Sequence, residues 1–257
     1  MARRSRPRVD LARLPAHVGV IMDGNGRWAK ARGRERTYGH RVGARAVRRV
    51  VRACRRMGVQ TLTLFAFSAQ NWGRPEDEVR LLMELLYEFI VQEWREIMDR
   101  DIRVVHLGEL RRVPAEVRDK LRALVQASRH NRSMTLALAL SYGGREEIVR
   151  AARRLAGRAA LGRLRAQAVD EACVGAAMYT RGLPDLDLLI RTGGERRISN
   201  FLLWQSAYAE LFFTDVLWPD FKVADLRAAI ADFQERRRRF GLTDEQLDAR
   251  RAGRAWS

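Results

Sequence analysis

The fold is decided by one stretch near the N-terminus, His17-Val18-Gly19-Val20-Ile21-Met22-Asp23-Gly24-Asn25-Gly26-Arg27-Trp28. Its first half, residues 17–22, is a short and almost continuously apolar run, which is typical of a buried β-strand. Its second half places a carboxylate and two glycines directly after that run. In a parallel sheet these residues would lie at the carboxyl end of the strand, where α/β proteins bind their ligands.

Similar apolar runs recur along the chain and alternate with helical patterns. The other predicted strands cover residues 61–67, 102–107, 134–140, 186–190 and 211–213, and the predicted helices cover residues 40–57, 77–99, 114–129, 144–156 and 223–239. Weaker periodicity over residues 157–182 predicts a small helix with loops. Continuously apolar strands separated by helices predict an α/β fold with a mostly parallel central sheet flanked by helices. We expect one domain over residues 15–245, a basic flexible tail at 1–14 and a C-terminal tail at 246–257.

The composition limits the class of protein. With 257 residues, 47% hydrophobic and 31% charged, the chain can bury a substantial core like an ordinary globular protein. No apolar segment reaches the roughly 18 residues that a membrane-spanning helix needs. The basic N-terminus lacks the apolar stretch of a secretory signal. Only Cys54 and Cys173 are present, without metal-ligand spacing, which favours a reducing cytoplasm.

The net charge of +18 raises the question of a polyanionic partner. Only three of the 49 basic residues are lysines, and the arginines are spread over the whole chain. This spread indicates compositional bias rather than a binding stripe, so we expect no nucleic-acid partner. Nucleic-acid binding stays as an alternative that predicts steeply salt-dependent affinity. Anionic substrates or peripheral contact with an anionic membrane surface would also suit the charge.

The loop after the first strand combines two kinds of binding residue. Asp23 stands where the strand ends and can bind Mg²⁺, which usually takes one or two carboxylates. Gly24 and Gly26 flank Asn25, and such glycines let backbone N–H groups approach a phosphate closely. Further donors follow at Arg36, His40 and Arg41.

Other interpretations of this loop are possible. A hairpin turn would be followed by an alternating strand, which is absent here. An EF-hand needs a bidentate Glu at its twelfth position, where Arg34 stands. A dinucleotide-binding loop would be accompanied by an acidic residue after the second strand, where Ser68-Ala69-Gln70 stands. From the residues alone, a phosphate-binding loop and a simple turn remain open.

The other predicted strands also end in polar loops. The second leads into residues 68–75, which offer a hydroxyl, two amides, an indole and a guanidinium, but which also fit a plain turn before a helix. The fourth leads into the glycine pair of residues 141–145. The fifth leads into residues 191–200, whose three arginines and paired glycines favour diphosphate binding. Glu210 lies in an apolar context, so it is either salt-bridged to an arginine or a metal ligand.

Several blocks in a fixed order resemble the cis-prenyltransferases, the family typified by bacterial undecaprenyl diphosphate synthase. The blocks are residues 17–29, Gly39-His40, Asn71-Trp72-x-Arg74-Pro75, Tyr142-Gly143-Gly144-Arg145, residues 191–205 and residues 208–219. The resemblance runs from about His17 to Gly241. It implies a homodimeric, Mg²⁺-dependent enzyme with an apolar tunnel that condenses isopentenyl diphosphate with an allylic diphosphate such as farnesyl or geranyl diphosphate. The product would be a Z-polyprenyl diphosphate, either the precursor of an undecaprenyl-type lipid carrier for the cell wall or a shorter chain.

The resemblance also implies residue roles. Asp23 would be the catalytic Mg²⁺ ligand, Glu210 a second metal ligand, and Asn71 an orienting or proton-relay group. The allylic substrate would be bound by Gly24, Asn25, Gly26, Arg27, Trp28, Arg36, His40, Ser68, Ala69 and Gln70. The isopentenyl diphosphate would be bound by Arg191, Arg197, Ile198 and Ser199, with Trp72 and Arg74 nearby. The terminal Arg239-Phe240-Gly241 would reach toward the neighbouring subunit's active site.

Two residues depart from the family pattern, which usually has Glu where Gln70 stands and Asn where Ser141 stands. Both lie close to the predicted site and bear on rate or product length. Tunnel walls are expected at Leu62, Leu64, Leu82, Leu85, Leu86, Phe89, Leu136 and Leu138, which are equally suited to a plain core. A non-catalytic subunit of the same family is a further alternative. Such subunits tend to lose the carboxylates and arginines that this chain retains.

Overall fold

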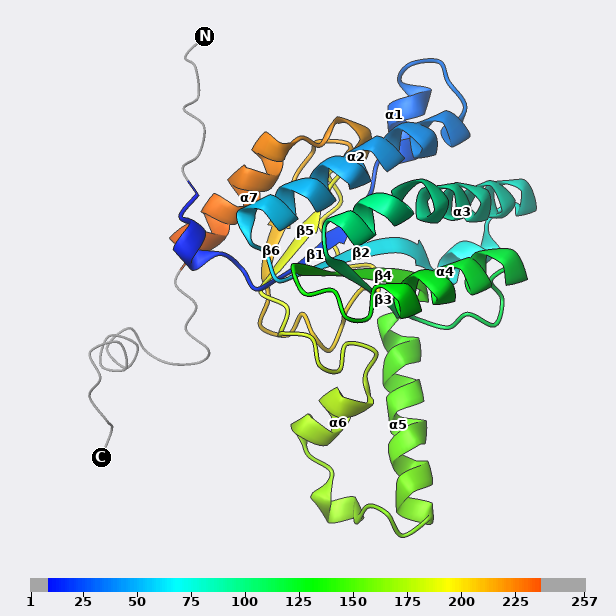
Figure 1. The fold of residues 1–257 in the computed structure, drawn as a ribbon, viewed down its shortest axis with the longest axis vertical. Helices are drawn as coiled ribbons and strands as arrows, with labels where there is room; N and C mark the ends of the chain where they lie inside the picture. The colour runs from blue at the N-terminus through cyan, green and yellow to red at the C-terminus, as the bar shows by residue number, and fades with distance from the viewer. Residues whose placement is uncertain (1–8, 237–257) are drawn as a thin grey trace.

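Six parallel strands form the central sheet of the computed structural model, which describes residues 9–236 (Figure 1). The strands are β1 (His17–Ile21), β2 (Thr61–Ser68), β3 (Ile102–Leu107), β4 (Met134–Tyr142), β5 (Leu188–Arg191) and β6 (Glu210–Phe213). Their order in the sheet is β3-β4-β2-β1-β5-β6. The predicted α/β fold is therefore confirmed, and every strand pair is parallel.

Most helices lie on one face of this sheet (Figure 1). This layer contains α2 (Arg36–Met57), α3 (Glu76–Asp99), α4 (Ala115–Ala127) and α7 (Val223–Glu235). The other face packs against loop residues such as Phe201 and Leu202, and α5 (Gly144–Ala160) and α6 (Glu171–Ala177) project away from it (Figure 1). Short 3₁₀ helices lie at Leu11–Arg13, Ala69–Gly73, Ala166–Ala168 and Trp218–Asp220.

One helix was not expected from the sequence. Helix α1 (Asn25–Lys30) forms where no apolar helical face is present. Gly24 precedes it with a φ of 108°, which favours glycine. A Cβ on Gly39 of α2 would lie 2.0 Å from the carbonyl oxygen of Asn25. Close packing against α2, rather than amphipathic periodicity, thus explains α1.

The register of the strands gathers four loops at one edge of the sheet. Ile21 pairs with Arg191, and Ser68 pairs with Tyr142, so β1, β2, β4 and β5 end close to one another. The loops that follow these strands carry most of the predicted site residues. Among residues 9–236, no helix has the length and apolar character needed to cross a membrane. The predicted C-terminal contact of Arg239-Phe240-Gly241 lies outside the described residues.

Candidate active site

The backbone of Asp23 is fixed by several hydrogen bonds just beyond the end of β1. Its N–H donates to the Thr192 hydroxyl over 3.0 Å, and that hydroxyl donates to the Asp23 carbonyl oxygen over 2.7 Å. The Trp218 N–H also donates to this carbonyl, over 3.0 Å. The carboxylate oxygen Oδ2 accepts from Arg191 over 3.0 Å and lies 3.2 Å from Arg27. The carboxylate is therefore held at the carboxyl edge of the sheet.

Arg191 links this carboxylate to the loop after β5. Its side chain is only 5% exposed, and its Nη1 donates to the Ser199 hydroxyl over 2.6 Å and to the carbonyl oxygen of Arg197. Gly193 and Gly194 have φ values of 87° and 83°, which turn the chain so that it returns to Arg191. The paired glycines noted in the sequence thus bring Arg197 and Ser199 back toward Asp23.

The loop after β2 is a 3₁₀ helix with reciprocal capping. The Ser68 hydroxyl accepts from the Asn71 N–H over 3.2 Å, and Asn71 Oδ1 accepts from the Ser68 N–H over 3.0 Å. Because the backbone occupies this carbonyl oxygen, the Asn71 amide offers its NH₂ group to a ligand. Such a group can orient a substrate oxygen, but it cannot act as a base.

Three predicted diphosphate-binding residues converge on Glu78, which the sequence did not single out. Glu78 Oε1 accepts from Arg74 over 3.0 Å and lies 3.4 Å from Arg36 and 3.9 Å from His40 Nε2. Burial, and then the neighbouring Arg74 charge, lower the pKa of His40 to about 4. His40 is therefore neutral at pH 7, and its buried Nε2 has no hydrogen-bond partner among the described residues. The spacing of Arg74 and Glu78, four residues apart, was the available signal for this pair.

A polar cleft of about 690 Å³ lies at this edge of the sheet. It brings together eight of the predicted residues, namely Asp23, Ser68, Gln70, Asn71, Arg74, Arg191, Arg197 and Ser199. Arg145 and Asn200, in the loops after β4 and β5, also line it although they were not predicted as site residues. Four arginines facing one cleft make it suited to a polyanion such as a diphosphate.

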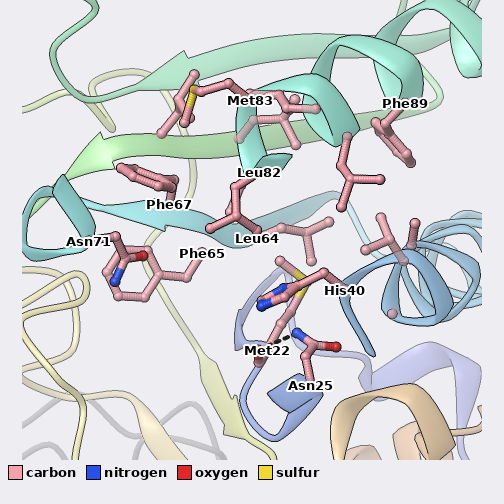
Figure 2. A pocket seen from close by; sticks show the side chains of 18 of the residues that line it. Met22, Asn25, His40, Leu64, Phe65, Phe67, Asn71, Leu82, Met83 and Phe89 are labelled. Atoms are coloured by element: carbon pink, nitrogen blue, oxygen red, sulfur yellow. Dashed lines mark hydrogen bonds between the residues drawn. The ribbon is translucent and has the colours of Figure 1, made fainter. Parts of the chain in front are cut away.

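A second, apolar cavity of about 190 Å³ lies between α2, α3 and the sheet (Figure 2). Six of the predicted wall residues line it, namely Leu64, Leu82, Leu85, Leu86, Phe89 and Leu138. Leu62 and Leu136, predicted with them, do not line it. Asn25 and His40 give this cavity a polar end. The cavity and the cleft adjoin each other, because they share four lining residues, namely Met22, Phe65, Asn71 and Arg74.

Comparison with known proteins identifies the family. A family model described as "Putative undecaprenyl diphosphate synthase" matches residues 21–241. The chain belongs to this prenyltransferase family. It is 48% identical over 236 residues to a ditrans,polycis-undecaprenyl-diphosphate synthase ((2E,6E)-farnesyl-diphosphate specific) of Xanthomonas axonopodis pv. citri, covering 92% of each chain. It is 46% identical over 234 residues to an isoprenyl transferase of Chlorobaculum tepidum, covering 91% of this chain and 88% of the relative.

A solved structure also matches this prenyltransferase. Lavandulyl diphosphate synthase from Lavandula x intermedia, in complex with dimethylallyl diphosphate, superposes with a TM-score of 0.87 at 38% identity. The match covers 89% of this chain and 98% of that one. The resemblance inferred from the sequence blocks is therefore confirmed, and with it the predicted enzyme class.

Some predicted substrate-binding residues of the prenyltransferase line neither the polar cleft nor the apolar cavity. These are Gly24, Gly26, Arg27, Trp28, Arg36, Ala69, Trp72 and Ile198. Arg27 and Arg36 still reach the site through their ion pairs with Asp23 and Glu78. Trp28 is instead buried and stacked on Tyr38, with the Arg32 guanidinium 4.0 Å from its ring centroid.

Trp72 has a structural partner at one of the two departures from the family pattern. Its indole N–H donates to the Ser141 hydroxyl over 2.8 Å, joining the loop after β2 to the end of β4. Ser141 has a φ of 51° and is buried. The hydroxyl at position 141 is thus satisfied within the protein.

Glu210 lies apart from Asp23 within one chain, so its role as a second metal ligand stays a prediction. Glu210 begins β6, where it pairs with Leu188, which in turn pairs with Val18. Asp23 lies beyond the other end of β1, roughly 16 Å further along at about 3.3 Å per residue. Glu210 forms an ion pair with Arg236 over 2.8 Å, which is the salt-bridge alternative left open by the sequence.

The remaining residues would fit a Mg²⁺ ion that takes only one or two of its ligands from the protein. Within residues 9–236, no group of three or more His, Cys, Asp or Glu side chains could hold a metal. Mg²⁺ commonly binds through one or two carboxylates and completes its shell with water and substrate phosphates. Asp23 supplies one such carboxylate at the wall of the cleft.

Proposed function

We propose that this prenyltransferase condenses isopentenyl diphosphate with an allylic diphosphate to give a Z-polyprenyl diphosphate. The observation that carries this proposal is the shared wall of the polar cleft and the apolar cavity. An allylic diphosphate has a highly charged head and an apolar chain, and it needs both environments in contact. The Xanthomonas relative is named as specific for (2E,6E)-farnesyl diphosphate, which supports farnesyl diphosphate as the primer.

The allylic chain would occupy the apolar cavity, with its diphosphate toward the polar end. There His40 and Asn25 line the cavity, and Arg36 and Arg74 approach through Glu78. Each five-carbon unit buried contributes about 4 kcal/mol at roughly 0.8 kcal/mol per CH₂. A growing chain would therefore be retained in the cavity between additions, and the cavity is the candidate for the predicted tunnel.

The isopentenyl diphosphate would bind in the polar cleft, where Arg191, Arg197 and Ser199 meet. In the reaction, a new carbon–carbon bond forms at the allylic carbon as its bond to the diphosphate oxygen breaks, and one proton leaves the isopentenyl unit. A single cation near the leaving group contributes on the order of 4 kcal/mol at a surface-like dielectric. Asn71 would orient the reactants through its NH₂ group, and the departing diphosphate, directly or through neutral His40, would take the proton.

Mg²⁺ is the proposed cofactor, with Asp23 as its protein ligand. When bound, the ion would neutralise diphosphate charge and so favour departure of the leaving group. Asp23 is already oriented for this role by its backbone bonds to Thr192 and Trp218. Glu210, which lies at the opposite edge of the sheet within one chain, remains only a predicted second ligand.

The proposal is tested by incubating the purified protein with labelled isopentenyl diphosphate, farnesyl diphosphate and Mg²⁺. We expect a labelled lipid that requires all three. Asp23→Ala should remove more than about nine-tenths of the turnover, since one essential electrostatic group contributes a factor of about 100 or more. Asp77→Ala is the matched control, because the Asp77 side chain is 93% exposed and lines neither hollow.

Two outcomes would favour the alternatives. A protein that makes no lipid by itself would support the non-catalytic subunit. Salt-dependent binding to DNA without measurable affinity for farnesyl diphosphate would support the hypothesis of a nucleic-acid-binding protein.

The assembly proposed for this enzyme is a homodimer. Helix α5 projects from the body of the molecule (Figure 1), and Val149 in the helix and Leu161 just after it are 48% and 68% accessible. Trp204, 39% exposed, is a further large apolar side chain at the surface. Light scattering should give twice the monomer mass, and a monomer at micromolar concentration would contradict this assembly.

A cytoplasmic location with peripheral membrane contact is also proposed. The free thiols of Cys54 and Cys173 suit a reducing compartment, and a net charge of +18 would favour an anionic lipid surface. Co-sedimentation with anionic vesicles, but not with neutral ones, is expected.

A further inference from the structure

Glu146 connects two loops that line the polar cleft. It lies in the first turn of α5, and its Oε1 accepts from the side-chain amide of Gln70 over 3.0 Å. Its Oε2 accepts from the side-chain amide of Asn200 over 2.9 Å. Gln70 belongs to the loop after β2, and Asn200 to the loop after β5. We propose that Glu146 is a positioning residue that sets the isopentenyl-diphosphate side of the cleft through this Gln70–Glu146–Asn200 clamp.

Asn200 links Glu146 to the residues that are proposed to bind the diphosphate. Its Oδ1 accepts from the Arg145 N–H over 2.8 Å, and its carbonyl oxygen accepts from the Gly144 N–H over 2.7 Å. Asn200 has a φ of 64° and Ser199 a φ of 48°, so both residues need external support for this conformation. Ser199 in turn accepts from Arg191. A shift of Asn200 would therefore displace the Ser199 hydroxyl from Arg191.

The glycine at position 143 is explained by the same contact. Gly143 has a φ of −156°, which any residue can adopt, so its backbone does not require glycine. A Cβ at this position would lie 2.1 Å from Glu146 Oε2 and 2.6 Å from Asn200 Nδ2. The bond between Glu146 and Asn200 thus passes through space that only glycine leaves empty.

The clamp also accounts for the neutral residue at position 70. Both oxygens of Glu146 accept from amide N–H groups. A glutamate at position 70, which the family pattern favours, would bring two carboxylates within hydrogen-bond distance. Such a pair repels, or it binds a proton at the expense of one charge. Gln70 therefore complements Glu146, and the two residues form one functional unit in this chain.

The role proposed for the clamp rests on the proposed function. It is tested by steady-state kinetics of a double-mutant cycle. Glu146→Gln and Gln70→Glu are each expected to raise KM for isopentenyl diphosphate about threefold to tenfold, the size of one lost hydrogen bond of ordinary strength. For Glu146→Gln, changes in kcat and in KM for farnesyl diphosphate should stay within about twofold, because Glu146 does not line the apolar cavity and was not among the predicted allylic contacts. The double variant should return close to wild type, because donor and acceptor have exchanged places.

Glu116→Gln is the matched control. Glu116 lies in the first turn of α4 and forms no ion pair with the described residues, so this variant measures the loss of an acidic residue at a helix start alone. The clamp is overturned if the double variant is no better than the worse single variant, or if Glu116→Gln has the same effect as Glu146→Gln. Thermal unfolding of each variant separates misfolding from loss of positioning.

A second readout separates this inference from the proposed function. If the wild type forms no lipid, the proposed function fails, and the same cycle is measured as affinity for inorganic diphosphate by calorimetry. Coupling between positions 70 and 146 in that affinity would still support the clamp. Additive effects there would overturn it.

Discussion

Replacing Phe89 by alanine is expected to lengthen the product. Phe89 lines both the apolar cavity and a smaller void of about 20 Å³. This void lies further along α2 and α3, where Val51, Ile97 and Leu136 contribute to its wall. In Figure 2, Phe89 lies on the side of the cavity away from Asn71, where the tail of a growing chain would arrive. Phe89 is thus the candidate floor of the cavity.

The size of the effect follows from what the substitution removes. Loss of the aromatic ring makes room for about one five-carbon unit, whose burial contributes about 4 kcal/mol. Since about 1.4 kcal/mol corresponds to a tenfold change in an equilibrium, the longer chain would be retained rather than released. The wall of the void includes the ion pairs Arg48–Glu93 and Arg52–Glu96, so we expect a gain of one or two units rather than unlimited growth. The loss of stability should stay below the about 3–5 kcal/mol of a fully buried Phe→Ala, because Phe89 is half-buried.

The assay compares dephosphorylated products of the wild type and Phe89→Ala by chromatography against standards of known carbon number. Tyr87→Ala is the control, since Tyr87 is an exposed aromatic residue of the same helix and lines neither hollow. An unchanged product length from a folded, active Phe89→Ala protein would refute the assignment of the floor. An equal shift from Tyr87→Ala would show that the change acts through α3 as a whole.

Two further predictions concern buried polar groups. Arg191→Lys should raise KM for isopentenyl diphosphate by at least about tenfold, because an ammonium cannot hold Asp23 and Ser199 together as the planar guanidinium does; steady-state kinetics would measure this, and a near-normal KM would contradict it. Burial lowers the pKa of three histidines: that of His17 falls below its usual value, and those of His40 and His106 fall to about 4. Because these pKa values are lower in the folded state than in the unfolded state, stability should be complete above about pH 6.5 and fall as the pH decreases toward 4. Thermal unfolding should show this fall, with a shallower slope in His106→Phe, and an identical slope in that variant would exclude His106 as a source.

The sequence was sufficient for the architecture because the strands are strongly patterned. Every residue of β1 and of β5 is buried, as expected of strands covered on both faces. The loops that follow such strands necessarily meet at one edge, which is why Asp23, Asn71, Arg191 and Ser199 could be grouped in advance. Glu210 is the first residue of the short edge strand β6, so its place depends on the direction of that strand, which the pattern of four residues does not specify.

Contacts between segments that are far apart in the sequence could not be predicted either. Glu78 and Glu146 look like ordinary acidic residues in the first turn of a helix, where they favour the helix dipole. Their partners Arg36, Gln70 and Asn200 lie between 42 and 76 residues away along the chain. Only the packing of the loops shows that these carboxylates hold site residues in place. The same holds for α1, whose formation depends on glycines of α2.

The carboxylates of Asp23 and Glu78 explain how several arginines can be held close together before any substrate is present. Arg27 and Arg191 share Asp23, while Arg36 and Arg74 share Glu78. Without such counter-ions, the arginines would repel one another and occupy many rotamers. In the proposed function, an arriving diphosphate would compete with a carboxylate for cations that are already oriented. Much of the ordering that binding normally requires has then taken place during folding, so more of the interaction with the diphosphate remains available for catalysis.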